Sequence, residues 1–194
     1  MLDLRFTSAE LRFATTTLAI IAALAPAVYF LLPAKKQDAT EHVKTFKKLI
    51  KAYSTLRPEA LVSTASRDFT HTVLPASLNL PSRPLNAFKG HAGMIFSLFE
   101  SFEMAPQPNG NGDAVHYSKE TNTVTAHCRM GGKVTAESSM GQKLIASGLT
   151  EWWTECVIFV QTSPDGKRII EVREFVHSAK AEELQERLSG VLRD

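Results

Sequence analysis

The chain has 194 residues, of which 44% are hydrophobic and 22% charged, and its formal net charge is +2. This balance is typical of a globular protein with a buried core and excludes a largely disordered chain. The charge is near neutral and no basic stripe alternates with aromatic residues, which argues against a nucleic-acid partner. Cys128 and Cys156 show neither a CxxC motif nor metal-ligand spacing, so we expect buried thiols and no metal site.

The first segment differs from the rest of the chain. Residues 13–34 carry no charge and lie between Arg12 and Lys35. A helix of this length spans about 33 Å, enough to cross a lipid bilayer, and predicts a transmembrane anchor. A cleaved signal peptide is the alternative, because Ala25 and Ala27 offer cleavage sites.

The distribution of basic residues sets the expected orientation of this anchor. More Lys and Arg residues follow the apolar segment than precede it. The positive-inside rule then predicts a single-pass membrane protein whose globular domain faces the cytosol. The chain would thus divide into an N-terminal segment, residues 1–37, and one domain, residues 38–194.

The first half of this domain has mainly helical patterns. An amphipathic helix is expected after an N-cap at Asp38 or Thr40, with an apolar face of Val43, Phe46, Leu49, Ile50 and Tyr53. Pro58 begins a short second helix, and a strand is expected at Asp68–Leu74. The proline-rich segment from Pro75 to Pro84 should be irregular, and a third helix is expected at Asn86–Phe102.

From Ala114 onward the hydrophobic period changes to two. It predicts strands at Ala114–Ser118, Thr123–Met130, Lys133–Glu137, Gly148–Gln161 and Arg168–His177. Gly131-Gly132 and the segment Pro164–Lys167 are expected to form hairpin turns. A helix from about Ala179 closes the chain, so helices followed by an antiparallel meander predict an α+β fold.

Two segments carry a resemblance to a known family. Thr154–Phe159, the turn Asp165-Gly166-Lys167 and Ile170–Val176 resemble the last hairpin of SnoaL-like proteins in the nuclear transport factor two-like superfamily. Phe69–Pro75 resembles the first strand of cyclases and isomerases of fungal secondary metabolism. The resemblance covers about residues 41–188. It implies a cone-shaped fold, a curved antiparallel sheet wrapped by helices around a pocket, here preceded by the N-terminal hydrophobic helix.

Members of this family include isomerases, cyclases and dehydratases, which need a base near neutral pKa inside a dry cavity. Histidine supplies this chemistry without a large pKa shift. His71, in the segment that resembles the family, is the first candidate for acid or base; the alternative is a hydrogen-bonded structural residue. His127 shares a strand face with Arg129, and this face points either to the pocket or to solvent.

Two carboxylates complete the predicted site. Glu155 shares a strand face with Trp153 and Phe159, where burial would raise its pKa; the alternative is an ion pair at the sheet edge. Glu174 and His177 lie on opposite faces of the last strand, so only one of them points inward. Family members commonly carry an acidic residue where this chain has His177. The resemblance therefore favours His177 at the pocket mouth.

We accordingly predict catalytic roles for His71, His127, Glu155 and His177, with Trp153, Phe159, Arg129 and Glu174 lining the substrate pocket. The predicted activity is that of a cofactor-free cyclase, isomerase or dehydratase acting on a small lipophilic polyketide or terpenoid intermediate in fungal secondary metabolism. The alternative is a non-catalytic module that binds a small molecule or assembles with protein. The resemblance also implies homodimers formed through the sheet, with Trp152 and Ile158 as a candidate patch.

Overall fold

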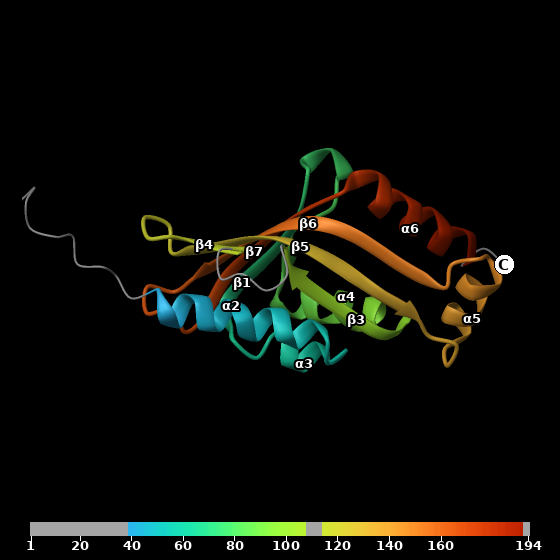
Figure 1. Ribbon diagram of the computed structural model, residues 1–194, viewed down its shortest axis with the longest axis horizontal. Helices are drawn as coiled ribbons and strands as arrows, with labels where there is room; N and C mark the ends of the chain where they lie inside the picture. The colour runs from blue at the N-terminus through green and yellow to red at the C-terminus, as the bar shows by residue number, and fades with distance from the viewer. Residues whose placement is uncertain (1–38, 108–113, 192–194) are drawn as a thin grey trace, which may run out of the picture. The chain divides into compact units, whose positions relative to one another are not determined.

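The structure, a computed structural model, describes residues 39–107 and 114–191 (Figure 1). Its helices are α2 (Thr40–Tyr53), α3 (Pro58–Leu61), α4 (Leu85–Phe96), α5 (Ser139–Ala146) and α6 (Ser178–Val191), with a 3-10 turn η1 (Ala76–Leu78). Its strands are β1 (Ala65–Leu74), β2 (Arg83–Pro84), β3 (Phe99–Pro106), β4 (Val115–Ser118), β5 (Thr123–Val134), β6 (Glu151–Thr162) and β7 (Ile169–Val176). The expected α+β class is confirmed.

The strands form one mixed sheet rather than the predicted antiparallel one. Their order is β2-β1-β7-β6-β5-β3, and β4 pairs with β5 beyond the end of β3. β1 runs parallel to β7, with Val73 opposite Glu174, whereas the other pairs are antiparallel. Alternation of side chains along a strand is the same for either direction of its neighbour, so the sequence pattern could not reveal the parallel pair.

The Gly131-Gly132 pair lies inside the long strand β5 and does not form the predicted hairpin turn. Gly131 has a φ of +146°, and a Cβ atom there would collide with the carbonyl oxygen of Trp152. A Cβ atom at Gly132 would collide with the carbonyl oxygen of Ser101 on the other side. The two glycines therefore allow β6 and β3 to approach β5 closely, which is a second use of glycine besides turns.

Two further elements differ from the predictions. The third helix ends at Phe96, and the apolar residues after it form β3 instead of another helical turn. Pairing with β5 satisfies the backbone of this segment and outweighs its helical pattern. Helix α5, which was not predicted, begins at an N-cap where the Ser138 hydroxyl accepts a hydrogen bond from the Gly141 amide at 3.1 Å.

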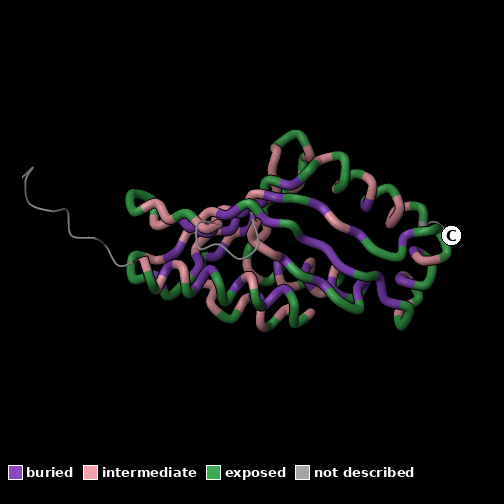
Figure 2. The backbone as a smooth tube through the Cα atoms, viewed as in Figure 1, coloured by how far each residue is buried: buried purple, intermediate pink, exposed green. Residues whose placement is uncertain are grey.

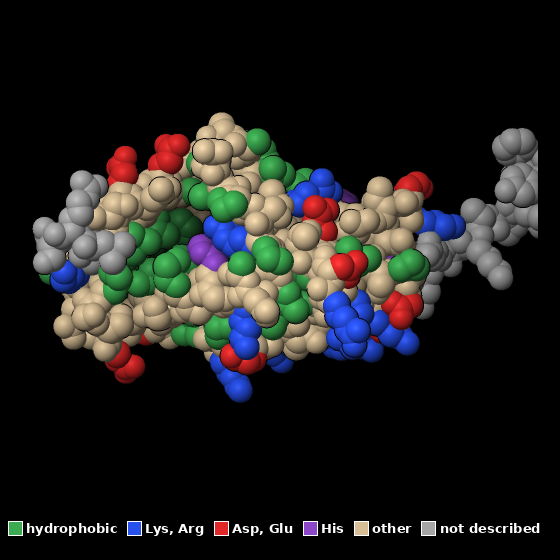
Figure 3. All heavy atoms as spheres, turned by 180° about the vertical axis from the view of Figure 1, so that it is seen from behind, with side chains coloured by type: hydrophobic (Ala, Val, Ile, Leu, Met, Phe, Trp, Pro, Cys, Tyr) green, Lys and Arg blue, Asp and Glu red, His purple; other side chains and the backbone are tan. Residues whose placement is uncertain are grey.

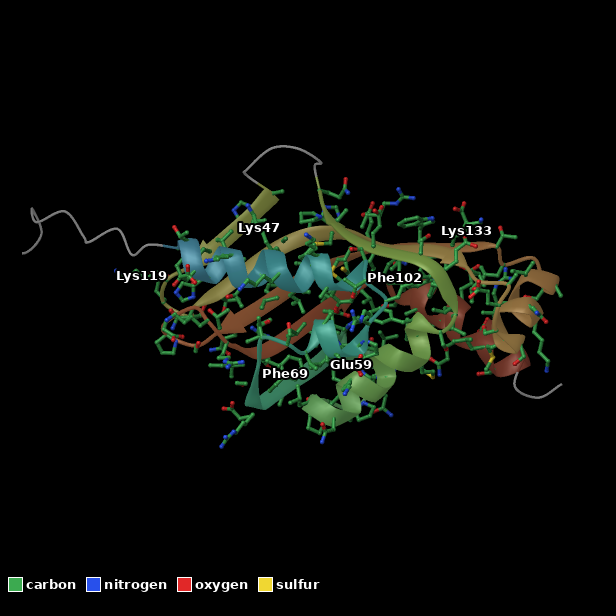
Figure 4. All side chains as sticks on the ribbon, turned by 90° about the horizontal axis from the view of Figure 1, so that it is seen from below. Lys47, Glu59, Phe69, Phe102, Lys119 and Lys133 are labelled. Atoms are coloured by element: carbon green, nitrogen blue, oxygen red, sulfur yellow. The ribbon has the colours of Figure 1, made fainter. Side chains whose placement is uncertain are left out.

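A single hydrophobic core lies between the sheet and the helices. Buried and exposed residues alternate along β5, β6 and β7 (Figure 2). Figure 4 shows α2, α3 and α4 in front of the strands, with Phe102 near the end of α2. The rings of Phe102 and Tyr53 stack with centroids 6.2 Å apart, and Phe96 and Phe99 extend this aromatic cluster. Cys128 and Cys156 are buried free thiols, as predicted.

The prediction of a single-pass membrane protein with a cytosolic domain is corrected. Within residues 39–107 and 114–191, no helix has the length and apolar character that crossing a membrane requires. The expected hydrophobic helix, residues 13–34, and the expected boundary between residues 37 and 38 lie outside the described residues.

The close approach of three strands at the glycine pair predicts the effect of adding one methyl group. Gly132→Ala should lower the free energy of unfolding by more than about 2 kcal/mol, because β3 and β5 must separate. Gly90→Ala is the control, since a Cβ atom at Gly90 in α4 meets nothing within 4 Å. It should be neutral or stabilise by up to about 1 kcal/mol. Urea unfolding followed by circular dichroism measures both; equal stability of the two variants would contradict the proposed strand contact.

Candidate functional site

A cavity of about 320 Å³ lies between α4, α6 and the inner face of β1, β6 and β7. Figure 3 shows the corresponding hollow, lined mainly by hydrophobic side chains, with basic and histidine side chains at its edge. Most of its wall is aliphatic or aromatic: Leu61, Val73, Leu78, Leu80, Phe88, Ala92, Met94, Ile95, Phe96, Phe102, Met130, Trp152, Val176, Ala181, Leu184 and Leu188. Its size and apolar lining are those of a small-molecule site.

A carboxylate is buried in this apolar wall. Glu174 on β7 is 7% exposed, and its Oε1 accepts a hydrogen bond of 2.7 Å from the hydroxyl of Tyr53 at the end of α2. Burial by itself raises the pKa of Glu174, but the charge interaction with His71 and the hydrogen bond from Tyr53 more than offset it, so the pKa is lowered. Burial and the neighbouring Glu174 charge raise the pKa of Tyr53 well above its ordinary value. The pair is thus a neutral phenol donating to an ionised carboxylate.

A histidine faces the other oxygen of this carboxylate. His71 on β1 is 2% exposed, and its Nε2 lies 3.4 Å from Glu174 Oε2. The contact is an ion-pair contact and not a well-aligned hydrogen bond, because neither ring nitrogen has a partner in hydrogen-bond geometry among the described residues. The ring packs against Phe88, with centroids 4.4 Å apart. His71 is therefore held in an apolar setting beside one negative charge.

Two further basic side chains line the cavity. Arg83 comes from β2 and His91 from α4, and both are partly exposed. Burial lowers the pKa of Arg83, while the charge of Glu174 opposes this effect. Burial, followed by the charges of Arg83 and His71, lowers the pKa of His91 from 6.5 to about 4. At neutral pH, His91 is consequently uncharged, whereas Arg83 is a cation.

A larger surface hollow of about 640 Å³ runs along α2, but we do not assign it a site. Its lining comes from Ala39 and α2 alone: Ala39, Thr40, Val43, Lys44, Lys47, Lys48 and Lys51. It contains no carboxylate, histidine or thiol, so it lacks a pair of groups for acid–base chemistry.

The predicted site residues separate into two faces of the sheet. His71 and Glu174 line the cavity. His127 and Glu155 contact each other at 3.2 Å, but on the outer face, where their side chains are 49% and 68% exposed. His177, just after β7, is also exposed. On β7 the inward set is the one that contains Glu174, because Val172 and Val176 on the same face are buried in the core.

The other predicted lining residues also lie outside the cavity. Arg129 stacks over Trp153 at 4.1 Å, and the Arg173 guanidinium lies 5.5 Å from the Phe159 ring centroid, all on the outer face of the sheet. Trp152 is buried and Trp153 is partly exposed, as expected for neighbouring residues of a strand, which point to opposite sides. The patch expected for dimerisation does not form, because Trp152 and Ile158 are both buried in the core of this chain.

Sequence reasoning did not identify Tyr53, Arg83 and His91 as cavity residues. Tyr53 fits the apolar face of its helix, and nothing in that pattern shows where its hydroxyl points. His91 lies in the expected third helix, and Arg83 lies in the segment expected to be irregular. The short pairing of β2 with β1 brings Arg83 opposite His71, a long-range contact that no local signal predicts. Among the described residues, no group of three His, Cys, Asp or Glu side chains could hold a metal ion.

The lowered pKa of His91 predicts a pH-dependent stability. Between pH 4 and 6.5 the unfolded chain binds a proton at His91 that the folded chain does not, so the free energy of unfolding decreases as the pH falls through this range. His91→Gln should reduce this decrease, whereas His116→Gln at an exposed position should preserve it. Urea unfolding at several pH values between 4 and 7 measures the difference; parallel curves for wild type and His91→Gln would contradict the assignment.

Comparison with solved structures gives matches over most of the chain. BvnE pinacolase from Penicillium brevicompactum matches with a TM-score of 0.66 and 13% identity, covering 82% of this chain and 97% of that protein. PrhC from Penicillium brasilianum matches with a TM-score of 0.65 and 9% identity, covering 79% and 91%. AusH from Aspergillus nidulans matches with a TM-score of 0.59 and 18% identity, covering 75% and 88%.

No protein-family model matches the sequence, and a comparison with curated proteins finds no significant match. The solved structures therefore show that the folds are similar. It agrees with the resemblance carried by Phe69–Pro75 and by the hairpin of β6 and β7. The described part of this chain has the fold of these three proteins, as the resemblance to SnoaL-like proteins of the nuclear transport factor two-like superfamily predicts.

Proposed function

We propose that this protein is an enzyme, an isomerase, cyclase or dehydratase that uses its own acid–base groups. Its substrate would be a small lipophilic polyketide or terpenoid intermediate of fungal secondary metabolism. The observation that carries this proposal is the buried His71–Glu174 pair, with Nε2 and Oε2 3.4 Å apart in the wall of an apolar cavity.

In this proposal His71 is the base. An Nε2–H directed at Glu174 leaves the lone pair on Nδ1, and that nitrogen has no hydrogen-bond partner among the described residues. Nδ1 could accept a proton from a carbon next to a carbonyl group or from a hydroxyl group. The same nitrogen could then return the proton at another position, which is the common requirement of isomerisation, ring closure and loss of water.

Glu174 and Tyr53 would position His71 and stabilise its charged form. An imidazolium formed at His71 gains the attraction of the Glu174 carboxylate, which is strong because water is largely excluded. The hydrogen bond from Tyr53 holds that carboxylate in place and favours its ionised form. The three groups thus form a chain of contacts that reaches from α2 through β7 to β1.

The shape and surroundings of the cavity support a lipophilic substrate. A volume of about 320 Å³ suits a compact molecule with one or two rings. The structural neighbour from Penicillium brevicompactum is a pinacolase, and the other two neighbours described above also come from fungi. A protein-assembly module has no need of an internal space, so the open cavity favours a ligand.

A variant of His71 tests this proposal. His71→Gln keeps a polar side chain but cannot take up a proton, and it should lower turnover by about 10²- to 10⁴-fold. His127→Gln removes a histidine from the exposed pair with Glu155 and should leave turnover unchanged. Metabolite profiles of producing cells with the gene intact, deleted or replaced by each variant measure the effect, and circular dichroism checks that the variants fold.

The expected result is one new intermediate that accumulates on deletion and with His71→Gln, but not with His127→Gln. If deletion accumulates no intermediate, the protein is not an enzyme of this kind and a small-molecule-binding role is favoured. If folded His71→Gln restores the product fully, another residue is the base.

A further inference from the structure

We propose that Arg83 is a substrate-binding residue that recognises an oxygen anion, either a carboxylate or the enolate oxygen formed during reaction, on an otherwise apolar ligand. This inference rests on the proposed function of the same cavity, because it places the ligand against His71. The charge of Arg83 would allow the cavity to distinguish anionic from neutral lipophilic molecules. An apolar wall alone makes this distinction poorly.

The pairing of β2 with β1 places this cation beside the proposed base. Arg83 lies directly opposite His71 in an antiparallel pair, so their side chains leave the same face of the sheet with Cβ atoms about 5 Å apart. Both residues line the cavity. One ligand can therefore contact the base and the cation with neighbouring atoms.

Arg83 carries a buried donor without a protein partner among the described residues. Its Nη1 is buried without a hydrogen-bond partner, and no ion pair within the described residues involves it. Glu174 is the carboxylate that lines the cavity, but its oxygens already face Tyr53 at 2.7 Å and His71 at 3.4 Å. An unpaired buried donor lowers stability, so its presence in a cavity wall points to a partner that arrives with the ligand.

The neighbouring histidine does not compete for this partner. The low pKa of His91, about 4, leaves its ring neutral at physiological pH. The positive charge that meets an anionic oxygen is then that of Arg83. A guanidinium also offers two parallel N–H donors, which match the two oxygens of a carboxylate.

The same arrangement serves the proton transfer. As His71 Nδ1 takes a proton from the carbon next to a carbonyl group, the C–H bond breaks and an N–H bond forms. The electron pair left on carbon forms a C=C bond, and the carbonyl electrons move to oxygen. Arg83 would donate to the resulting enolate oxygen, so its interaction strengthens as the charge develops.

Two planar probes of equal shape test the anion site without the natural substrate. At neutral pH, 2-naphthoate carries a carboxylate and 2-naphthamide is its neutral counterpart. Titrations of the full chain followed by calorimetry should show 2-naphthoate binding at least about tenfold more tightly. Arg83→Met should reduce this ratio to about one, Arg83→Lys should retain part of it, and Arg168→Met at an exposed position should retain all of it.

A stability measurement separates binding from structure. If Arg83 serves a ligand, Arg83→Met removes an unpaired buried donor and should raise the melting temperature of the free protein by about 2–4 °C. Equal affinity of wild type for both probes, no binding of either, or an unchanged ratio in Arg83→Met overturns the proposal. So does a lower melting temperature of Arg83→Met, which would assign Arg83 a structural role.

His71→Gln distinguishes this inference from the proposed function. A folded His71→Gln protein that keeps the carboxylate preference but loses product formation supports both. If it keeps the preference and also makes product, the anion site stands and the acid–base role of His71 fails.

Discussion

The burial of the Glu174 carboxylate is the constraint on which the arrangement of this site depends. An isolated charge in an apolar wall would be neutralised or would unfold its surroundings. Glu174 stays ionised because Tyr53 donates to one oxygen and His71 faces the other. These partners come from α2 and β1, so α2 and the parallel strand pair must both be in place before the charge is compensated. The carboxylate therefore links helix packing to strand register.

The cavity beside Glu174 lowers the stability of the fold. Unpaired nitrogens at His71 and Arg83 and an open volume of about 320 Å³ remove contacts that a filled core would have. The aromatic cluster of Tyr53, Phe96, Phe99 and Phe102 forms dense packing beside this space. Close strand contacts hold β5 against β6 at Gly131 and against β3 at Gly132. A rigid wall around an incompletely filled space is what binding a small molecule requires.

The sequence predicted the strands of the sheet better than the site on it. Alternation identified β5, β6 and β7 and correctly grouped Trp153, Glu155 and Phe159 on one face of β6. It could not decide which face points inward, because both faces of that strand carry large apolar residues. The inner set is Trp152, Cys156 and Ile158, which are buried in the core, and the Trp152 indole donates to the Lys180 carbonyl of α6, a contact remote in sequence. The sequence identified Glu174 and His71 but not the residues beside them. Tyr53, which contacts Glu174, is about 120 residues away in the chain, and Arg83, which lies opposite His71, is about 12 residues away. No local pattern predicts such contacts.

Two histidine–glutamate pairs in this chain show why residue type and distance do not define a site. His127 and Glu155 are closer, at 3.2 Å, than His71 and Glu174, at 3.4 Å. The outer pair is about half exposed or more, so water and salt screen it and the interaction contributes about 1 kcal/mol or less. The inner pair lies where water is largely excluded, and the nearby His71 helps to lower the pKa of Glu174. The same two residue types therefore form a buried pair on the inner face and only a weak surface contact on the outer face, and the difference follows from which side of the sheet the helices cover.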